Sequence, residues 1–158
     1  MAFTTHCFIR KNTPELRKKL EQLGHTICKC CEFQGADWLH VCVIKDIYRT
    51  VHGVGYTDEE SEIYGLVTQE EVFNRFLNTT NAVDCETNEE LFFALAAMRD
   101  DSDCMQWFVN QHGYFTLCPN DNVLEYKSCY GKYQYRIIDD TYHKATVKEI
   151  IEHFKKIN

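Results

Sequence analysis

Four stretches of the chain carry apolar residues three and four positions apart, the spacing that gathers them on one face of an α-helix. These stretches cover 13–23, 69–77, 88–99 and 147–157. We expect the apolar face of each helix to be buried. The residues of these faces are Leu16, Leu20, Leu23, Val72, Phe76, Leu91, Leu95, Met98, Ile150 and Phe154.

Each stretch opens with the pattern of a capping box, in which a polar residue and a glutamate three positions later satisfy each other's backbone N–H groups. Gly24 follows the first stretch and suits a helix C-cap, because glycine adopts the left-handed conformation at little cost. Caps and apolar stripes together predict four helices. The four capping pairs are Asn12 with Glu15, Thr68 with Glu71, Thr87 with Glu90, and Thr146 with Glu149.

The segments between these helices alternate in polarity or are rich in β-branched and aromatic residues, which predicts β-strands. Polar or glycine-containing turns at 34–37, 110–113 and 131 separate neighbouring strands and predict three β-hairpins. The expected strands cover 3–9, 25–33, 38–44, 48–56, 63–67, 82–85, 104–109, 114–118, 123–130 and 132–138.

The helical stretches recur at a nearly constant offset, which is 75 for the first and third (87 − 12 and 95 − 20) and 78 for the second and fourth (146 − 68). Fixed-period similarity is typical of internal repeats, although any two capped amphipathic helices share these features. We predict an α+β fold made by tandem duplication of a small strand-helix-strands-helix unit, with antiparallel sheets and about four helices. The first α/β repeat would cover 1–78 and the second 79–158, packed together as one globular unit.

The chain has 158 residues and a net charge of −7, but its charges are unevenly distributed. Residues 50–125 contain two Lys or Arg and fifteen Asp or Glu, a local charge of 2 − 15 = −13. This block is consistent with a solvated acidic surface, or with a surface that meets a basic partner or imitates nucleic acid. Binding to nucleic acid itself is disfavoured, because neutralising phosphates requires a basic excess.

The longest apolar run, 91–98, is far too short to cross a bilayer. Residues 1–11 lack the apolar core of a signal peptide. We therefore expect a cytoplasmic protein without membrane association. In that compartment the nine cysteines would stay reduced and would mostly pack as small apolar side chains.

A metal site is one interpretation of the cysteines and histidines in the first half of the chain. Cys28 and Cys30 would share one face of an expected strand, and a hairpin could bring His40 or Cys42 opposite them. Four such ligands can hold zinc tetrahedrally. The alternative, which we favour, is that these thiols pack between strands, so that we expect no metal and no cofactor.

A cysteine-dependent enzyme would need a thiol beside a histidine base. Cys85 or Cys104 with His112 or His143 supply the residue types. No local signature marks any of these pairs, and nine cysteines with seven histidines make chance pairings common. The catalytic residues of such an enzyme are therefore unknown from the sequence.

Aromatic residues make up 13% of the chain and gather in the expected hairpins. Packing within a sheet is one explanation, because strands favour aromatic side chains. An interaction surface is the other, because Tyr and Trp are enriched where proteins meet. The residues expected on such a surface are Trp38, Trp107, Tyr126, Tyr130, Tyr133 and Tyr135.

The stretches NEELFFALAAMRDDSDCMQWF (88–108) and HKATVKEIIEHF (143–154) resemble segments of small uncharacterised proteins from gut Bacteroidales genomes and their phages. The resemblance is confined to these two motifs in the second half of the chain. It implies a bacterial or phage cytosolic setting. It carries no activity and no catalytic residue to this sequence.

These observations favour a non-enzymatic protein-binding or regulatory module that acts through an unknown protein partner. A small cysteine-dependent enzyme and a zinc-binding domain are the alternatives. The sequence indicates neither the partner nor the oligomeric state.

Overall fold

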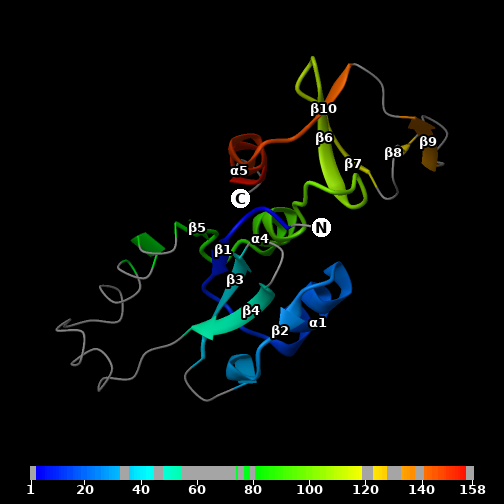
Figure 1. The fold of residues 1–158 in the computed structure, drawn as a ribbon. Coiled ribbons are helices and arrows are strands. Elements are labelled where there is room, and N and C mark those ends of the chain that lie inside the picture. Colours follow the sequence, from blue (N-terminus) through cyan, green and yellow to red (C-terminus); the bar gives the residue numbers. More distant parts are fainter. Residues whose placement is uncertain are drawn as a thin grey trace.

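The structure, a computed structural model, describes residues 3–32, 36–44, 48–54, 74, 77–78, 81–118, 123–127, 133–137 and 141–155 (Figure 1). Its helices are α1 (Pro14–Leu23), α4 (Glu89–Ala96) and α5 (Val147–Lys155), and a 3₁₀ turn covers Lys29–Glu32. The chain is a mixed α+β protein, as the sequence predicts. The strands are β1 (Cys7–Ile9), β2 (Thr26–Ile27), β3 (Trp38–Ile44), β4 (Tyr48–Val54), β5 (Val83–Asp84), β6 (Gln106–Asn110), β7 (Phe115–Cys118), β8 (Val123–Lys127), β9 (Tyr133–Ile137) and β10 (Tyr142–Lys144).

The largest sheet has five strands in the order β2-β4-β3-β1-β5 (Figure 1). β3 pairs antiparallel with both β1 and β4, whereas β2 runs parallel to β4 and β5 runs parallel to β1. The prediction of an antiparallel sheet is therefore wrong for the two edge strands, β2 and β5, which run parallel to their neighbours. Parallel strands need a long crossover connection. α1 provides that connection between β1 and β2, and residues 55–82 separate β4 from β5.

One face of this sheet is covered by α1 and α4. Alternation along β1 and β3 places Cys7, Ile9, Leu39 and Val41 on this face, and all four are fully buried. Leu95 of α4 lies in the same cluster, so strands and helices share one continuous core. The other buried helical residues of the cluster, including two from α5, are Leu16, Leu20, Leu91, Phe92, Ala94, Ala96, Ile150 and Phe154.

The opposite face of the sheet carries the alternate residues of β1 and β3. Phe8 is fully buried there and packs against Trp38, with ring centroids 5.8 Å apart. Leu77 and Ala82, from the segment that leads into β5, pack on the same cluster. Trp38 is thus half-buried in sheet packing.

A second sheet has the order β10-β6-β7, all antiparallel. Its hairpin turns at Gly113, which has a φ of 82° and donates its N–H to the carbonyl of Asn110 at 3.0 Å. This confirms the hairpin predicted around 110–113. β8 and β9 pair antiparallel as a separate two-stranded sheet, which confirms the third expected hairpin, although its turn lies outside the described residues.

The caps of α1 and α4 lie one residue later than the capping-box pattern predicts. Thr13 Oγ1 accepts the N–H of Leu16 at 3.2 Å, and Asn88 Oδ1 accepts the N–H of Leu91 at 3.1 Å. Both positions follow another residue able to cap, so spacing alone could not select between them. Gly24 is the left-handed C-cap of α1 with a φ of 108°, as predicted.

α4 ends earlier than the expected limit at residue 99. His25 Nε2 donates to the carbonyl of Ala96 at 2.7 Å, and Gln106 Nε2 donates to that of Ala97 at 2.7 Å. These two side chains satisfy carbonyls that the next helical turn would otherwise use. Met98 consequently lies beyond the helix, half-buried against the core.

The strand expected over 25–33 is wrong beyond residue 27. The chain turns there into the 3₁₀ segment, and β2 pairs with β4 rather than forming a hairpin with β3. The Asn12 side-chain amide donates to the carbonyls of Cys31 and Ala36 and holds this turn. Gly53 lies so close to the turn that a Cβ on it would be 2.7 Å from the Cα of Cys31.

The capping box of α5 is confirmed at both of its hydrogen bonds. Glu149 N–H donates to Thr146 Oγ1 at 3.2 Å, and Thr146 N–H donates to Glu149 Oε1 at 3.0 Å. His143 Nε2 lies 2.9 Å from both carboxylate oxygens of Glu149. Burial would raise the pKa of Glu149, but the hydrogen bonds from Thr146 and His143 outweigh it and lower that pKa from its ordinary value of 4.5.

This cap predicts a pH-dependent contribution to stability. A carboxyl whose pKa is lower in the folded protein stabilises the fold above its unfolded pKa, and the contribution is lost as pH falls through the folded value. Glu149→Gln should lower the free energy of unfolding by about 0.5–1 kcal/mol at neutral pH. In urea titrations the difference from wild type should shrink below pH 4.5. The control is Glu152→Gln, at an exposed site on α5. Its free energy of unfolding should equal that of wild type both at neutral pH and below pH 4.5.

The predicted duplication is not confirmed. β1 and β5 are parallel neighbours and each leads into a helix, but the hairpin β3–β4 joins β1 whereas β6–β7 joins β10. The boundary between 1–78 and 79–158 remains a prediction. One of the four expected helices, 69–77, lies outside the described residues apart from helical positions at 74 and 77. The same holds for its cap at Thr68 and for the strand expected over 63–67.

Candidate functional site

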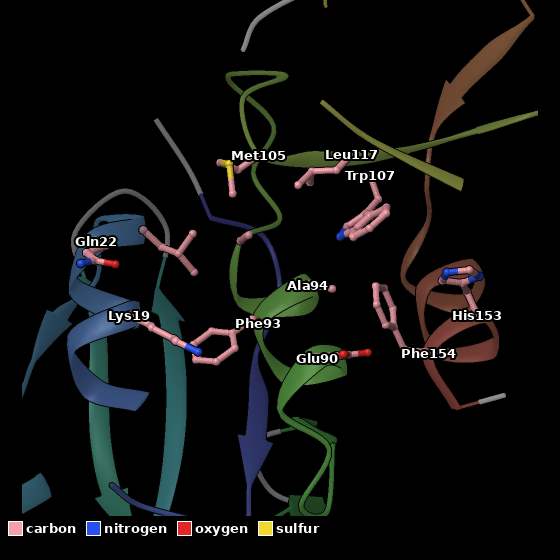
Figure 2. Close-up of a pocket in the computed structure, with 12 residues that line it drawn as sticks. Lys19, Gln22, Glu90, Phe93, Ala94, Met105, Trp107, Leu117, His153 and Phe154 are labelled. Atoms are coloured by element: carbon pink, nitrogen blue, oxygen red, sulfur yellow. The ribbon is translucent and has the colours of Figure 1, made fainter. Parts of the chain in front are cut away.

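An open, mostly apolar groove of about 760 Å³ lies between α1, α4, α5 and the β6–β7 hairpin (Figure 2). Each wall comes from a different part of the chain, so only the tertiary fold assembles it. The lining residues are Lys19, Gln22, Leu23, Glu90, Phe93, Ala94, Ala97, Met105, Trp107, Leu117, His153 and Phe154.

α4 forms the floor of the groove. Leu91 and Leu95 turn into the core, and Phe93, the buried Ala94 and the buried C-cap residue Ala97 line the groove. Ala94 is a small residue and lies between the larger rings on either side of it (Figure 2). Small side chains on the floor therefore give the groove its depth.

Trp107 and Phe154 form one wall. Their ring centroids are 5.3 Å apart in an edge-to-face arrangement, which aromatic pairs prefer. His153 stacks on Phe115 with centroids 4.1 Å apart and an interplanar angle of 13°. The wall is thus a set of contacting rings that joins α5 to the hairpin.

Met105 stands at the edge of the groove in an unusual conformation. Its φ is 60°, a left-handed value that costs a non-glycine residue roughly 1–2 kcal/mol. Its side chain is 41% exposed, and its N–H donates to the carbonyl of Cys118 at 2.7 Å. The strained backbone therefore holds a flexible apolar side chain in solvent beside the aromatic wall.

Gln106 supports this edge from within. Its buried side chain accepts the N–H of Arg99 at 3.1 Å and donates to the carbonyls of Ala97 and Cys104. The amide thereby ties the end of α4 to β6. Sequence patterns missed Gln106, because no periodic or motif signal distinguishes a buried glutamine from an exposed one on a strand.

Two charged residues mark the groove's rim. Lys19 Nζ lies 5.3 Å from the centroid of the Phe93 ring, within the range of a cation–π contact. Glu90 is exposed, and Figure 2 shows its carboxylate directed toward the Phe154 ring. The groove thus presents one positive and one negative group beside apolar surface.

The 3₁₀ turn and the residue before it bring a group of cysteine side chains together. Cys30 N–H donates to Cys28 Sγ at 3.5 Å, and Gly53 N–H donates to Cys30 Sγ at 3.3 Å. Hydrogen bonds from the Cys30 thiol and N–H lower the pKa of Cys28. Burial is the main cause that raises the pKa of Cys30, and it raises the pKa of Cys31 to about 12.

This turn carries a signal that the sequence interpretation overlooked. Cys28 and Cys31 have the C-x-x-C spacing, and Cys28 and Cys30 have C-x-C. The segment was expected to be a strand, where such spacing has no special geometry. On a turn the same spacing brings sulfurs close to one another.

The four residues considered for zinc are divided between the two faces of the large sheet. Cys28 and Cys30 pack against the core cluster on the face covered by helices. Alternation along β3 places His40 and Cys42 on the other face, where His40 stacks on His6. No group of three or more His, Cys, Asp or Glu side chains in the described part of the chain could hold a metal ion.

The residue pairs considered for thiol catalysis are not brought together as a site. Burial raises the pKa of Cys85 to about 12, which opposes a nucleophilic role. Cys104 and His112 lie beyond opposite ends of β6. His143 instead contacts Glu149 at the cap of α5.

The residues expected on an interaction surface separate in the same way. Trp107 lines the groove, whereas Trp38 packs against Phe8 on the far face of the large sheet. Tyr126, Tyr133 and Tyr135 lie on the paired strands β8 and β9. Tyr130 lies outside the described residues.

No helix in the described ranges combines the length and the apolar character needed to span a bilayer. Comparison of the chain with protein-family models, with curated proteins and with solved structures finds no match.

Proposed function

We propose that the protein is a non-enzymatic protein-binding module that receives an apolar segment of a partner protein in the groove between α1, α4, α5 and the β6–β7 hairpin. The observation that carries the proposal is the composition of this open groove, with Phe93, Met105, Trp107, Leu117 and Phe154 around a floor of alanines. Trp, Phe and Met are enriched at the centres of protein interfaces.

Met105 adds a second argument. Strained backbone persists only where the surrounding structure enforces it, and it gathers at binding and catalytic sites. Here the strain lies at an edge of the groove, at Met105, a residue that is 41% exposed. Methionine adapts its shape to different apolar partners, which suits a surface that closes on a ligand.

The rim indicates the chemistry of the bound segment. Lys19 already lies over Phe93, so the positive end of the groove is occupied by a cation–π contact. Glu90 has no ion-pair partner in the described part of the chain and stands beside Phe154. We therefore propose a segment with apolar anchors and a Lys or Arg that reaches Glu90. The surplus of acidic residues in 50–125 favours the same kind of partner.

The expected setting is the bacterial or phage cytosol, with a protein partner and without nucleic acid or membrane. Affinity purification from such a host, followed by measurement of Kd for the recovered partner, tests the proposal. A peptide partner should carry the basic apolar pattern described above. Recovery only of a small apolar molecule in the groove, with no protein, would contradict a protein-binding role.

Met105→Gly separates binding from folding. Glycine relieves the left-handed strain, so the free energy of unfolding should stay level or rise by up to about 1 kcal/mol. Partner binding should weaken by about tenfold, because a residue at the groove edge loses its whole apolar side chain. Titration calorimetry measures the affinity and urea unfolding measures the stability.

The matched control is Tyr114→Ser, which removes an aromatic side chain that is 69% exposed at the tip of the hairpin and does not line the groove. It should bind like wild type. An equal loss of partner affinity in Met105→Gly and Tyr114→Ser would show that the hairpin tip, and not the groove, contacts the partner.

A further inference from the structure

The 3₁₀ turn Lys29–Glu32 and the residue before it place three cysteines against the edge of the large sheet, and none of them lines the groove. We propose that Cys28 and Cys30 form a dithiol site that exchanges with small-molecule disulfides and closes reversibly into a Cys28–Cys30 disulfide. This inference is independent of the proposed protein-binding function.

The turn and the residue before it are held by contacts from two distant parts of the chain. Cys28 N–H donates to the carbonyl of Val51 at 2.9 Å, and the side-chain amide of Asn12 donates to the carbonyl of Cys31 at 2.8 Å. The Arg17 guanidinium donates to Asn12 Oδ1 and orients that amide. The cysteine backbone is therefore fixed before any reaction, which lowers the entropic cost of bringing two sulfurs together.

Each reacting sulfur has a backbone N–H directed at it. Cys28 Sγ accepts from Cys30 N–H at 3.5 Å, and Cys30 Sγ accepts from Gly53 N–H at 3.3 Å. Such donors stabilise a thiolate more than a thiol. The Cys30 thiol also donates to Cys28, so Cys28 is the sulfur that loses its proton first.

The three cysteines have different exposure and different roles. Cys28 and Cys30 are both half-buried thiols, whereas Cys31 is only 2% exposed. Cys31 Sγ donates to the carbonyl of Val51 at 3.3 Å and stays protonated. A solvent-accessible pair thus lies next to one inert thiol, and the assignment of roles follows from access and hydrogen bonding.

The chemistry takes two exchange steps. The Cys28 thiolate attacks one sulfur of a small-molecule disulfide, and the S–S bond breaks to leave a mixed disulfide on Cys28 and one departing thiolate, which takes a proton from water. Cys30 then gives its proton to solvent and attacks the Cys28 sulfur, which releases the second small thiol. Two electrons pass from the protein dithiol to the small disulfide, and one disulfide replaces another.

The first experiment uses the full chain, reduced and then treated with glutathione disulfide under native conditions. Intact mass spectrometry should show the loss of two hydrogens without a bound glutathione. Trypsin cleaves after Lys29, between the two cysteines. A Cys28–Cys30 disulfide should therefore appear as two fragments that separate only on reduction.

The variants assign the roles. Cys30→Ser should stop at the mixed disulfide, with one glutathione on Cys28, because serine cannot resolve it. Cys28→Ser should give neither product in the same time. Cys31→Ser and Cys42→Ser should form the linked fragments as wild type does. If Cys30→Ser still formed the linked fragments and Cys31→Ser did not, Cys31 rather than Cys30 would be the thiol that attacks Cys28. That result would overturn the assignment of Cys30.

A reactivity measurement provides a readout that a purely structural role would not change. Iodoacetamide should modify Cys28 about tenfold faster than Cys42, because the thiolate is the nucleophile. Cys30→Ala removes the thiol donor and should slow this reaction, whereas Cys30→Ser keeps a hydroxyl donor and should preserve most of it. Equal rates at Cys28 and Cys42, in protein whose circular dichroism shows a native fold, would overturn the proposal.

Discussion

Leu95→Ala is expected to lower the free energy of unfolding by roughly 2–5 kcal/mol, the range of buried leucine truncations. Leu95 is fully buried on α4 and belongs to the cluster that joins the large sheet to all three α-helices of the described part. Because α4 packs on both β1 and α5, we expect the space left by the leucine to close only if these elements move. Urea unfolding followed by circular dichroism measures the loss.

The exposed variant Gln22→Ala on α1 is the control for this measurement and should change the stability by less than about 0.5 kcal/mol. Because α4 and α5 pack on each other, Leu95→Ala should also loosen the groove between them. A loss within error for Leu95→Ala would mean that this face of α4 is not core, contrary to the contacts described above.

Gly53→Ala is expected to destabilise the protein by about 1–3 kcal/mol, the range for an extra group in a packed site. A Cβ at Gly53 would lie 2.7 Å from the Cα of Cys31 and 2.8 Å from the carbonyl oxygen of Cys30. Both are backbone atoms, so β4 and the 3₁₀ turn would have to separate. The same displacement would remove the Gly53 N–H from Cys30 Sγ, and the disulfide exchange of the turn should slow in parallel.

Gly113 is the matched control because its backbone conformation, and not a lack of space for a side chain, is what favours glycine there. It has a φ of 82° and open space around the position of a Cβ, so Gly113→Ala should cost about 1 kcal/mol through backbone strain alone. Asparagine tolerates the left-handed conformation. Gly113→Asn should therefore recover much of the loss, whereas Gly53→Asn should be worse than Gly53→Ala. A Gly53→Asn variant more stable than Gly53→Ala would refute the steric explanation.

Features that depend on a few neighbouring residues were predictable from the sequence. The capping box at Thr146 and Glu149 and the C-cap at Gly24 are confirmed because their donors and acceptors lie within one helical turn. The hairpin at Gly113 is likewise a local structure. At α1, two adjacent residues could cap, and Thr13 does so while Asn12 instead holds the carbonyls of Cys31 and Ala36.

Features that depend on distant contacts were not predictable. The segment after Ile27 has a strand-like composition, yet Asn12 and Gly53 hold it as a turn, and that turn gives three cysteines their geometry. The interaction residues expected from aromatic content included Trp107, which lines the groove, but the pattern did not mark Phe93 or Met105. Hydrophobic periodicity within one helix does not predict which faces of different helices will pack together.

The α+β class and the three described helices could be predicted from local patterns, because apolar spacing and capping act over one or two turns. The apolar spacing also identified Leu16, Leu20, Leu91, Leu95, Ile150 and Phe154 as buried, but it did not mark Phe92, which is fully buried on α4. The parallel edges of the large sheet, the groove and the cysteine turn form only when distant segments meet in the folded protein. Each of these requires contacts between segments far apart in the chain, and the energies of such contacts depend on the packed positions of both partners rather than on either local pattern.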